Sequence, residues 1–257
     1  MTEGHDRLVD RLRSAGRVAV AFSGGFDSVF LLSAAMEASA GDCVAVFVDL
    51  PMLSDRQRSD AVAAAEALGA QLIVAEVGWD RLPGILDNDG RRCYICKKAV
   101  YAAVREAASG PGCDLCVCGD NADDLRTHRP GRAAAEEMGI MRPLEELGIG
   151  RAEIVGKVRS LGLGCRIAKE TCLLTRLPAD RPVDAGVLKD IASYEEDVRR
   201  ICGVDQVRFR LGDGRALVQT SAAEVPLLVG RLAELAEHFS DEGIYIDIDR
   251  EGYEGLD

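Results

Sequence analysis

A short glycine-rich turn between an apolar strand and an apolar helix constrains this chain most. Residues 23–28 read SGGFDS, after a strand predicted at 17–22 and before a helix predicted at about 27–38. Two adjacent glycines let the backbone turn sharply and bring its N–H groups close to an anion. The first turn of the helix adds unpaired N–H donors and the positive end of the helix dipole. The pattern predicts a phosphate-binding turn at the end of a strand.

The side chains of this turn add chemistry to the backbone. Ser23 and Ser28 bring hydroxyl donors, and Asp27 is a candidate Mg²⁺ ligand and catalytic residue. We therefore expect Ser23, Gly24, Gly25, Asp27 and Ser28 to bind nucleotide phosphates. The turn lacks the lysine of a kinase-type phosphate loop and the spacing of a dinucleotide-binding loop. The alternative is a turn that only caps a helix.

Strands and helices alternate along most of the 257 residues, 47% of which are hydrophobic, enough for a substantial core. This order favours an α/β fold with a buried parallel sheet. Ligands of such sheets bind at the carboxyl ends of the strands. Further strands are predicted at 43–49, 71–77, 114–118 and 165–167, and helices at 54–68, 94–108 and 151–161.

After Pro178 the pattern changes to a helix, two alternating strands, a helix and a last strand. These elements are predicted at 188–202, 206–211, 216–220, 225–238 and 244–248. We expect a doubly wound parallel sheet in residues 1–176. A small α+β domain, for substrate binding or oligomerisation, is expected in residues 177–257.

The net charge and the cysteine content limit the classes of function that this protein can have. A net charge of −12 argues against a large nucleic-acid surface. No apolar run reaches the roughly 18–20 residues of a membrane helix. The charged N-terminus has no signal-peptide core, so we expect a cytoplasmic protein. In that setting the nine cysteines indicate metal or redox chemistry more than disulfides.

Three cysteines lie in polar, turn-rich segments. Cys93 and Cys96 form Cys-x-x-Cys in RRCYICKK at a predicted helix start, where the dipole and basic neighbours favour the thiolate. Cys172 lies in KETCLLTR, a polar turn near the expected domain boundary. Three thiolates suit three corners of a [4Fe–4S] cluster with one iron open to sulfide. Alternatively, Cys172 acts alone as sulfur donor or nucleophile.

A second Cys-x-x-Cys pair, Cys113 and Cys116, follows the first after sixteen residues. Taken alone, this spacing fits a structural zinc site. The second pair lies in or beside a predicted core strand (CDLCVC), where cysteine behaves as a small apolar residue. We therefore favour the trio in the polar segments as the metal ligands.

Several polar residues follow predicted strands and are further candidates for the site. Asn121 and Asp124 lie in a charged loop at 119–132 and suit metal or ribose contacts, although a solvated acidic turn is an open alternative. Asp49 ends the strand at 43–49 and is a candidate nucleotide contact. Trp79 could stack on a substrate ring or cover the core. Arg129, beside His128, is a candidate anion contact.

In the C-terminal part, Arg208 and Arg210 alternate with Phe209, so both arginines point to one face of a strand. Two arginines on one face can grip a phosphate. The alternative is surface pairing with neighbouring carboxylates.

The turn matches the signature of the PP-loop ATP pyrophosphatases, and the chain resembles the LarE family of PP-loop sulfur transferases. The resemblance runs in order through SGGFDS, VDLPMLS, RRCYICKK, GDNADDLRTHRPGRAAAE, RPLEELGIGRAEI, KETCLLTR and QVRFRLGDGRALVQ. It implies that ATP, with Mg²⁺, adenylates a substrate carboxylate, pyrophosphate leaves, and sulfur replaces oxygen. The implied substrate is a pyridinium dicarboxylate mononucleotide, a precursor of the nickel-pincer nucleotide cofactor.

The resemblance also bears on the sulfur chemistry and the substrate site. Cys93, Cys96 and Cys172 are similar to the members that hold a [4Fe–4S] cluster for sulfide relay. A substrate or anion site is implied at Arg208 and Arg210 with Glu196 nearby. The implied partners are a small nucleotide-like substrate and further copies of the chain, and the sulfur source is open.

Two departures leave the acceptor open: Phe26 replaces a commoner valine, and Asp120 stands where threonine is usual. The alternatives are a sulfur transferase acting on another small molecule or on tRNA, an amidating ligase of the same superfamily, and a nucleotide-sensing module without catalysis. The net charge of −12 counts against tRNA.

Overall fold

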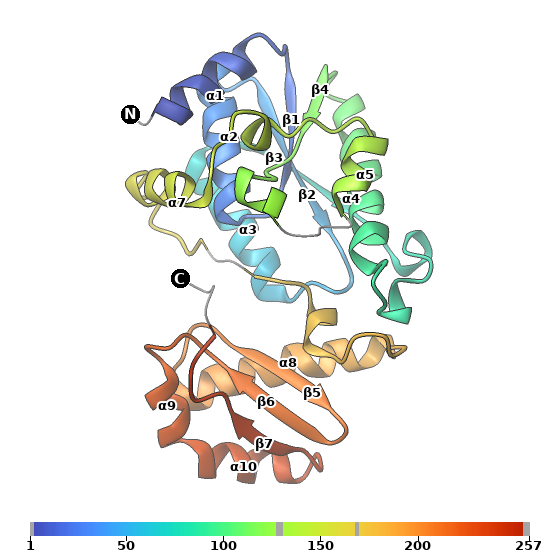
Figure 1. Cartoon of the computed structure of the whole chain (residues 1–257), viewed down its shortest axis with the longest axis vertical. Helices are drawn as coiled ribbons and strands as arrows, with labels where there is room; N and C mark the ends of the chain where they lie inside the picture. Colours follow the sequence, from blue (N-terminus) through green and yellow to red (C-terminus); the bar gives the residue numbers. More distant parts are fainter. Residues whose placement is uncertain (1–2, 127–130, 168–169, 254–257) are drawn as a thin grey trace. The chain divides into compact units, whose positions relative to one another are not determined.

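The glycine-rich turn follows the first strand of a four-stranded parallel sheet (Figure 1). The computed structural model describes residues 3–126, 131–167 and 170–253. The sheet has the order β3-β2-β1-β4, and every neighbouring pair is parallel. Its strands are β1 (Val18–Phe22), β2 (Cys43–Asp49), β3 (Gln71–Glu76) and β4 (Leu115–Val117). The predicted α/β class is confirmed, and the sheet is consistent with a PP-loop, HUP-like domain.

Helices cover both faces of this sheet. The connections β1–β2–β3 run in one direction along the sheet and β3–β4 runs back, so right-handed crossovers place their helices on opposite faces. Figure 1 shows α2 and α3 on one side and α4 and α5 on the other. The helices are α1 (Glu3–Arg13), α2 (Phe26–Ala38), α3 (Asp55–Leu68), α4 (Arg92–Ser109), α5 (Gly131–Glu137), α6 (Pro143–Glu146) and α7 (Arg151–Ser160), with 3₁₀ turns at Trp79–Arg81, Ile85–Asp87 and Ala122–Arg126.

Burial explains why the sequence forms these elements. β2 reads CVAVFVD and is buried at six consecutive positions, as expected for a strand covered on both faces. α2 is apolar around its circumference because it packs on β1, on α1 and on α7. α1 was not among the predicted elements, yet Leu8 and Leu12 bury one face of it.

The chain divides into two compact units. The first comprises residues 1–51, 56–85 and 90–168, and the second comprises 52–55, 86–89 and 169–257. The second unit contains a mixed three-stranded sheet, with β5 antiparallel and β7 parallel to the central β6. Its elements are a 3₁₀ turn (Leu173–Arg176), α8 (Ala185–Cys202), β5 (Arg208–Gly212), β6 (Arg215–Gln219), α9 (Val225–Gly230), α10 (Leu232–Ser240) and β7 (Tyr245–Ile248).

An aromatic cluster fills the core of the second unit. The ring of Phe209 on β5 lies 5.1 Å from the ring of Tyr194 on α8 and 5.1 Å from that of Phe239 on α10. Val218 and Leu235 are buried in the same core. One face of the small sheet is therefore sealed by helices, and residues alternating with Phe209 lie on the other face.

Two predicted elements differ from the structure. The strand predicted at 165–167 does not form, and these residues lie in a bend that follows two left-handed glycines, Gly162 and Gly164. The helix predicted at 225–238 is interrupted between α9 and α10 at Arg231, which leaves helical geometry directly after Gly230. Among the described residues, no helix has the length and apolar character needed to cross a membrane.

Candidate active site

The glycine-rich turn forms a tight cradle at the N-terminus of α2. Gly24 has φ +75°, and a β-carbon there would lie 2.6 Å from the Cα of Ala61 on α3. Gly25 caps α2 with an extended backbone. Only glycine fits position 24, because both the backbone conformation and the space exclude a side chain. Without side chains at Gly24 and Gly25, an anion could approach the backbone N–H groups of the turn closely, apart from that of Ser23, which donates to the Ser28 hydroxyl at 3.2 Å.

The two serines of the turn lie side by side. The hydroxyl oxygens of Ser23 and Ser28 are 3.3 Å apart, and the Ser28 hydroxyl donates to the carbonyl of Gly25 at 2.9 Å. Ser28 is buried whereas Ser23 is exposed. Ser28 thus stabilises the turn from inside, and Ser23 presents its hydroxyl at the surface.

The loop after β4 packs directly on this turn. A β-carbon at Gly119 would lie 3.0 Å from the carbonyl carbon of Asp27 and 3.1 Å from the amide nitrogen of Ser28. β1 and β4 are neighbours at the point where the strand order reverses. Ligands of open α/β sheets bind at this switch point.

Hydrogen bonds connect the two loops to the start of α7. The Asn121 amide donates to the Asp27 carboxylate at 3.2 Å, and its carbonyl oxygen accepts from the Asp123 N–H at 2.9 Å. The Asp123 carboxylate accepts from the N–H of Arg151 at 2.7 Å. Asp124 accepts from the Asn121 N–H at 3.2 Å. The predicted residues Asp27, Asn121 and Asp124 are thus brought together.

Other predicted residues of the first unit have different surroundings. The Asp49 carboxylate, at the end of β2, accepts from the Arg58 guanidinium at 2.7 Å. Trp79 lies half-buried in the 3₁₀ turn after β3. Arg129, like His128, lies outside the described residues.

Cys93 and Cys96 lie in the first turns of α4. Their spacing of three places both on one side of the helix, with Cys93 exposed and Cys96 half-buried. The neighbouring lysines have carboxylate partners: the Lys97 ammonium lies 3.9 Å from the Asp120 carboxylate, and Lys98 donates to Glu137 at 3.0 Å. Asp120 therefore has a structural partner beside the cysteine pair.

Cys172 belongs to the second unit, where a hydrogen-bonded turn holds it. The backbone N–H and the hydroxyl of Thr175 donate to the Cys172 carbonyl at 3.0 and 2.8 Å. The guanidinium of Arg176 donates to the Thr171 hydroxyl at 2.7 Å and to the Glu195 carboxylate of α8 at 2.6 Å. A buried ion pair thus anchors the cysteine-bearing turn.

Arg208 carries a buried guanidinium without a full set of partners. The residue is 3% exposed, and its Nε and Nη2 atoms have no hydrogen-bond acceptor. The guanidinium stacks 3.6 Å from the ring of Tyr253. Burial lowers the pKa of Arg208, as does the positive charge of Arg176. A buried donor of this kind is a ready site for an anionic ligand.

Arg210 and Glu196 differ from Arg208 in their surroundings. Arg210 shares the face of β5 with Arg208, but its guanidinium donates to Gln219. Glu196 has a side chain that is 56% exposed and pairs with Arg199 at 2.7 Å. The carboxylate that lies against β5 is that of Glu195, which accepts from the Phe209 N–H at 3.1 Å.

Glu195 and Arg151 are not among the site residues predicted from the sequence. Glu195 falls in the buried stripe of α8 with Leu188, Ile191 and Val198, and a carboxylate inside an apolar stripe is a detectable signal of a buried pair. Arg151 is the first residue of α7, after Gly150. Its proximity to the phosphate loop arises only in the folded structure, so the sequence gives no signal for it.

The remaining cysteine pair occupies the opposite, amino-terminal edge of the sheet. Cys116 lies in β4 beside Ala19 of β1, and burial raises the pKa of both Cys113 and Cys116. These surroundings are typical of cysteine as a small apolar residue. Within either unit, the described residues include no group of three or more His, Cys, Asp or Glu side chains placed to hold a metal ion.

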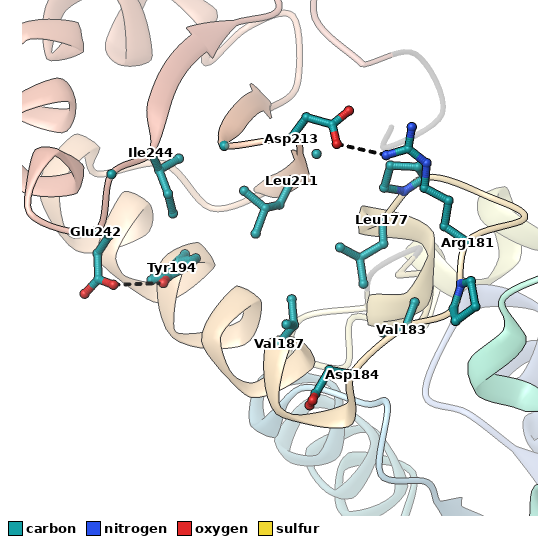
Figure 2. Close-up of a pocket in the computed structure, with 15 residues that line it drawn as sticks. Leu177, Arg181, Val183, Asp184, Val187, Tyr194, Leu211, Asp213, Glu242 and Ile244 are labelled. Carbon is teal, nitrogen blue, oxygen red and sulfur yellow. Dashed lines mark hydrogen bonds and ion pairs between the residues drawn. The ribbon is translucent and has the colours of Figure 1, made fainter.

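A hollow of about 430 Å³ lies in the second unit (Figure 2). Leu177, Val183, Val187, Leu211 and Ile244 give it an apolar lining. The ion pair of Arg181 with Asp213 and the hydrogen bond of Tyr194 to Glu242 lie at its rim. None of the predicted site residues lines it.

Comparison with known proteins places the chain among relatives that match most of its length. It is 30% identical to an uncharacterized protein of Synechocystis sp. over 242 residues, 93% of this chain and 90% of the relative. It is 29% identical to an uncharacterized protein of Methanocaldococcus jannaschii over 227 residues, 88% of this chain and 86% of the relative. No family model matches the chain.

A third relative has a named activity. The pyridinium-3,5-bisthiocarboxylic acid mononucleotide synthase of Lactiplantibacillus plantarum is 26% identical over 220 residues, 85% of this chain and 79% of the synthase. This similarity supports the resemblance drawn from the sequence motifs. The chain belongs to the same family as the Synechocystis protein, and its similarity to the synthase supports describing that family as LarE-like.

Proposed function

We propose that this protein is an ATP-dependent, AMP-forming sulfur transferase. The observation that carries the proposal is the phosphate cradle at the switch point, joined by Asn121 to the loop after β4. Similarity to the synthase supports a sulfur-transferring enzyme in general. We assign ATP to the cradle, because the backbone N–H groups at the N-terminus of a helix can bind phosphate without a lysine.

The first half-reaction assigned to the cradle is adenylation. A carboxylate oxygen of the substrate attacks the α-phosphorus of ATP, the bond to the β-phosphate oxygen breaks, and pyrophosphate leaves. Gly24, Gly25 and the first turn of α2 hold the pyrophosphate charge, with Ser23 and Ser28 as hydroxyl neighbours. Asp27, oriented by Asn121, would hold Mg²⁺, which supplies charge neutralisation on the phosphates.

The second half-reaction replaces oxygen by sulfur. A sulfur nucleophile attacks the carbonyl carbon of the acyl adenylate, the bond to the AMP oxygen breaks, and AMP leaves with a thiocarboxylate as product. In a direct route the Cys172 thiolate is this nucleophile: it forms a thioester, and loss of its Cα proton to water then breaks the Cβ–Sγ bond, which releases the thiocarboxylate and leaves dehydroalanine at position 172. The turn that carries Cys172 is anchored by the Arg176–Glu195 pair, close to Arg208. Arg208 is assigned to the anionic part of the substrate.

The chemistry of the donors also fits an iron–sulfur cluster. Cys93 and Cys96 offer two thiols on one side of α4, and Cys172 would be the third ligand. When bound, such a cluster supplies an iron site for sulfide. The substrate we propose is the pyridinium dicarboxylate mononucleotide, whose bisthiocarboxylic product names the Lactiplantibacillus relative.

The test is an anaerobic reaction of the protein with ATP, Mg²⁺, pyridinium-3,5-dicarboxylic acid mononucleotide and sulfide. AMP, pyrophosphate and the substrate are followed by chromatography and mass spectrometry. We expect AMP and pyrophosphate in equal amounts and a gain of about 16 Da for each oxygen replaced by sulfur. Asp27→Asn is expected to abolish both products, whereas the exposed-surface variant Arg159→Gln is not. Hydrolysis of ATP to ADP, or no AMP, would contradict the proposal.

A further inference from the structure

Arg151 places a guanidinium beside the phosphate loop with one nitrogen lacking any acceptor. Its Nη2 atom is inaccessible to solvent and makes no hydrogen bond. Burying an N–H donor of a charged group without an acceptor costs free energy that a ligand can recover. This nitrogen of the guanidinium therefore lacks an acceptor, and an anion could supply one.

The phosphate loop itself positions this side chain. The Arg151 guanidinium carbon lies 6.0 Å from the ring centroid of Phe26, within the range of a cation–π contact. Phe26 stands between Gly25 and Asp27, in the middle of the cradle. The departure at position 26 from the commoner valine thus gives the guanidinium an aromatic neighbour inside the loop.

The backbone of Arg151 is fixed independently of its side chain. Its N–H donates to the Asp123 carboxylate at 2.7 Å. Asp123 is linked through Asn121 to Asp27 by hydrogen bonds of 2.9 and 3.2 Å. These hydrogen bonds hold the start of α7 to the loop after β4 and to the phosphate cradle. The Cα atom from which the Arg151 side chain extends therefore has a fixed position.

Among the described residues, no acceptor satisfies the Nη2 atom of Arg151. Glu153 is a nearby carboxylate with a buried, unpartnered oxygen. Residues two apart on a helix do not face each other, and the Glu153 carboxylate packs against Gly4 of α1. The acceptor has to come from outside the described chain.

We propose that Arg151 binds the pyrophosphate portion of ATP, an inference that rests on the proposed function of the loop. The guanidinium contacts the β- or γ-phosphate oxygens in the bound nucleotide. When the α-phosphorus is attacked and its bond to the β-phosphate oxygen breaks, the charge that develops on the leaving pyrophosphate is neutralised by the same group. Arg151 then acts as a catalytic residue of adenylation, and Phe26 is its positioning residue.

Calorimetric titration of the full-length protein with α,β-methylene-ATP and, separately, with AMP tests this assignment. Arg151→Gln keeps the backbone N–H to Asp123, so circular dichroism should be unchanged. We expect affinity for α,β-methylene-ATP to fall about 10- to 100-fold and affinity for AMP to stay the same. Phe26→Leu should lower the affinity for the analogue about two- to fivefold. Arg159→Gln, on an exposed position of α7, is the matched control.

Each outcome separates the two proposals. Equal affinity of wild type and Arg151→Gln for the analogue overturns this inference and leaves the loop as the ATP site. An equal loss for AMP and the analogue also overturns it, because the side chain would then support the whole site. Wild type that binds no analogue with Mg²⁺ refutes ATP binding by the loop and hence the proposed function. Arg151→Lys, which keeps the charge, provides the measurement if Arg151→Gln does not fold.

Discussion

At the scale of single residues, Gly24 is the least replaceable position of the phosphate cradle. Its positive φ is a conformation that other residues rarely adopt, and its hydrogen faces the backbone of α3. A side chain here would displace either the turn or Ala61 of the helix.

Gly24→Ala is expected to destabilise the protein by about 1–3 kcal/mol and to remove binding of ATP analogues. The added β-carbon would strike the Ala61 backbone and open the cradle. Urea unfolding and calorimetry measure the two effects. Gly69→Ala is the control, because Gly69 also has positive φ but lies in open space. Equal analogue binding in the two variants would show that the contact with α3 is unimportant for the nucleotide.

Glu195→Gln is expected to destabilise the second unit by about 3–5 kcal/mol, since it removes the buried carboxylate closest to Arg176 and leaves that arginine the more distant carboxylate of Glu170. Glu196→Gln, one residue away and largely exposed, should change stability by about 0–1 kcal/mol. Urea unfolding of both variants gives the comparison. Similar values for the two would mean that the Arg176 pair contributes no more than a surface contact.

These neighbours also show where sequence reasoning reaches its limit at the residue scale. The sequence motifs lead to Glu196, whereas the carboxylate buried against β5 is Glu195. Side chains of adjacent helical residues point about 100° apart. A motif that does not say which side of the helix is buried therefore cannot distinguish Glu195 from Glu196 as the residue facing β5. The buried apolar stripe of α8 supplies that phase.

At the scale of elements, a carboxylate ties the start of α9 to the loop before β5. Glu224 accepts from the Asp205 N–H at 2.6 Å and from the hydroxyls of Thr220 and Ser221, each at 2.9 Å. Burial acts to raise the pKa of Glu224, but these hydrogen bonds outweigh it and the pKa is lowered. The ionised carboxylate therefore stabilises the fold.

The sign of this effect predicts acid sensitivity. A lowered pKa contributes stability above the pKa of the unfolded chain, about 4.3, and this contribution is lost as the pH falls through the folded value. Glu224→Gln should be less stable than wild type at pH 7, with a difference that shrinks towards pH 3. Urea unfolding across this range measures it, with the exposed Glu237→Gln as control. A constant difference at every pH would contradict the assignment.

Element prediction from the sequence succeeded where burial dictates the pattern. β2 has the predicted bounds because its apolar run is covered on both faces. The strand expected at 165–167 does not form, because three residues (Cys-Arg-Ile) are too short a run to specify a neighbouring strand, and the left-handed glycines before them bend the chain. The break between α9 and α10 falls at Arg231, directly after Gly230, a residue type of low helix propensity that the amphipathic pattern around it outweighed in the prediction.

At the scale of the whole molecule, the three cysteines proposed as cluster ligands are distributed over the two units. Cys93 and Cys96 belong to the first unit and Cys172 to the second. Neither a local sequence pattern nor the structure of one unit determines the distances between these three thiols. The glycine-rich turn, in contrast, consists of consecutive residues within one unit, so a short motif is enough to predict its position between a strand and a helix.

Anaerobic purification followed by iron and acid-labile sulfide assays tests the cluster. We expect about four irons per chain, lost in Cys93→Ala, Cys96→Ala and Cys172→Ala but retained in the control Cys113→Ala. Bound zinc that depends on Cys93, Cys96, Cys113 and Cys116 would favour a structural metal instead. A metal-free wild-type protein with a Cys172 that loses its sulfur during reaction would favour direct donation.

The anchoring of the Cys172 turn has a consequence for repeated use of the protein. Its carbonyl is held by Thr175, and Arg176 is locked to α8, so these attachments do not depend on the sulfur atom. Chemistry that consumes or reloads the thiol leaves this scaffold in place. We therefore expect a spent molecule to keep the fold of a charged one, so that restoring the sulfur atom does not require refolding.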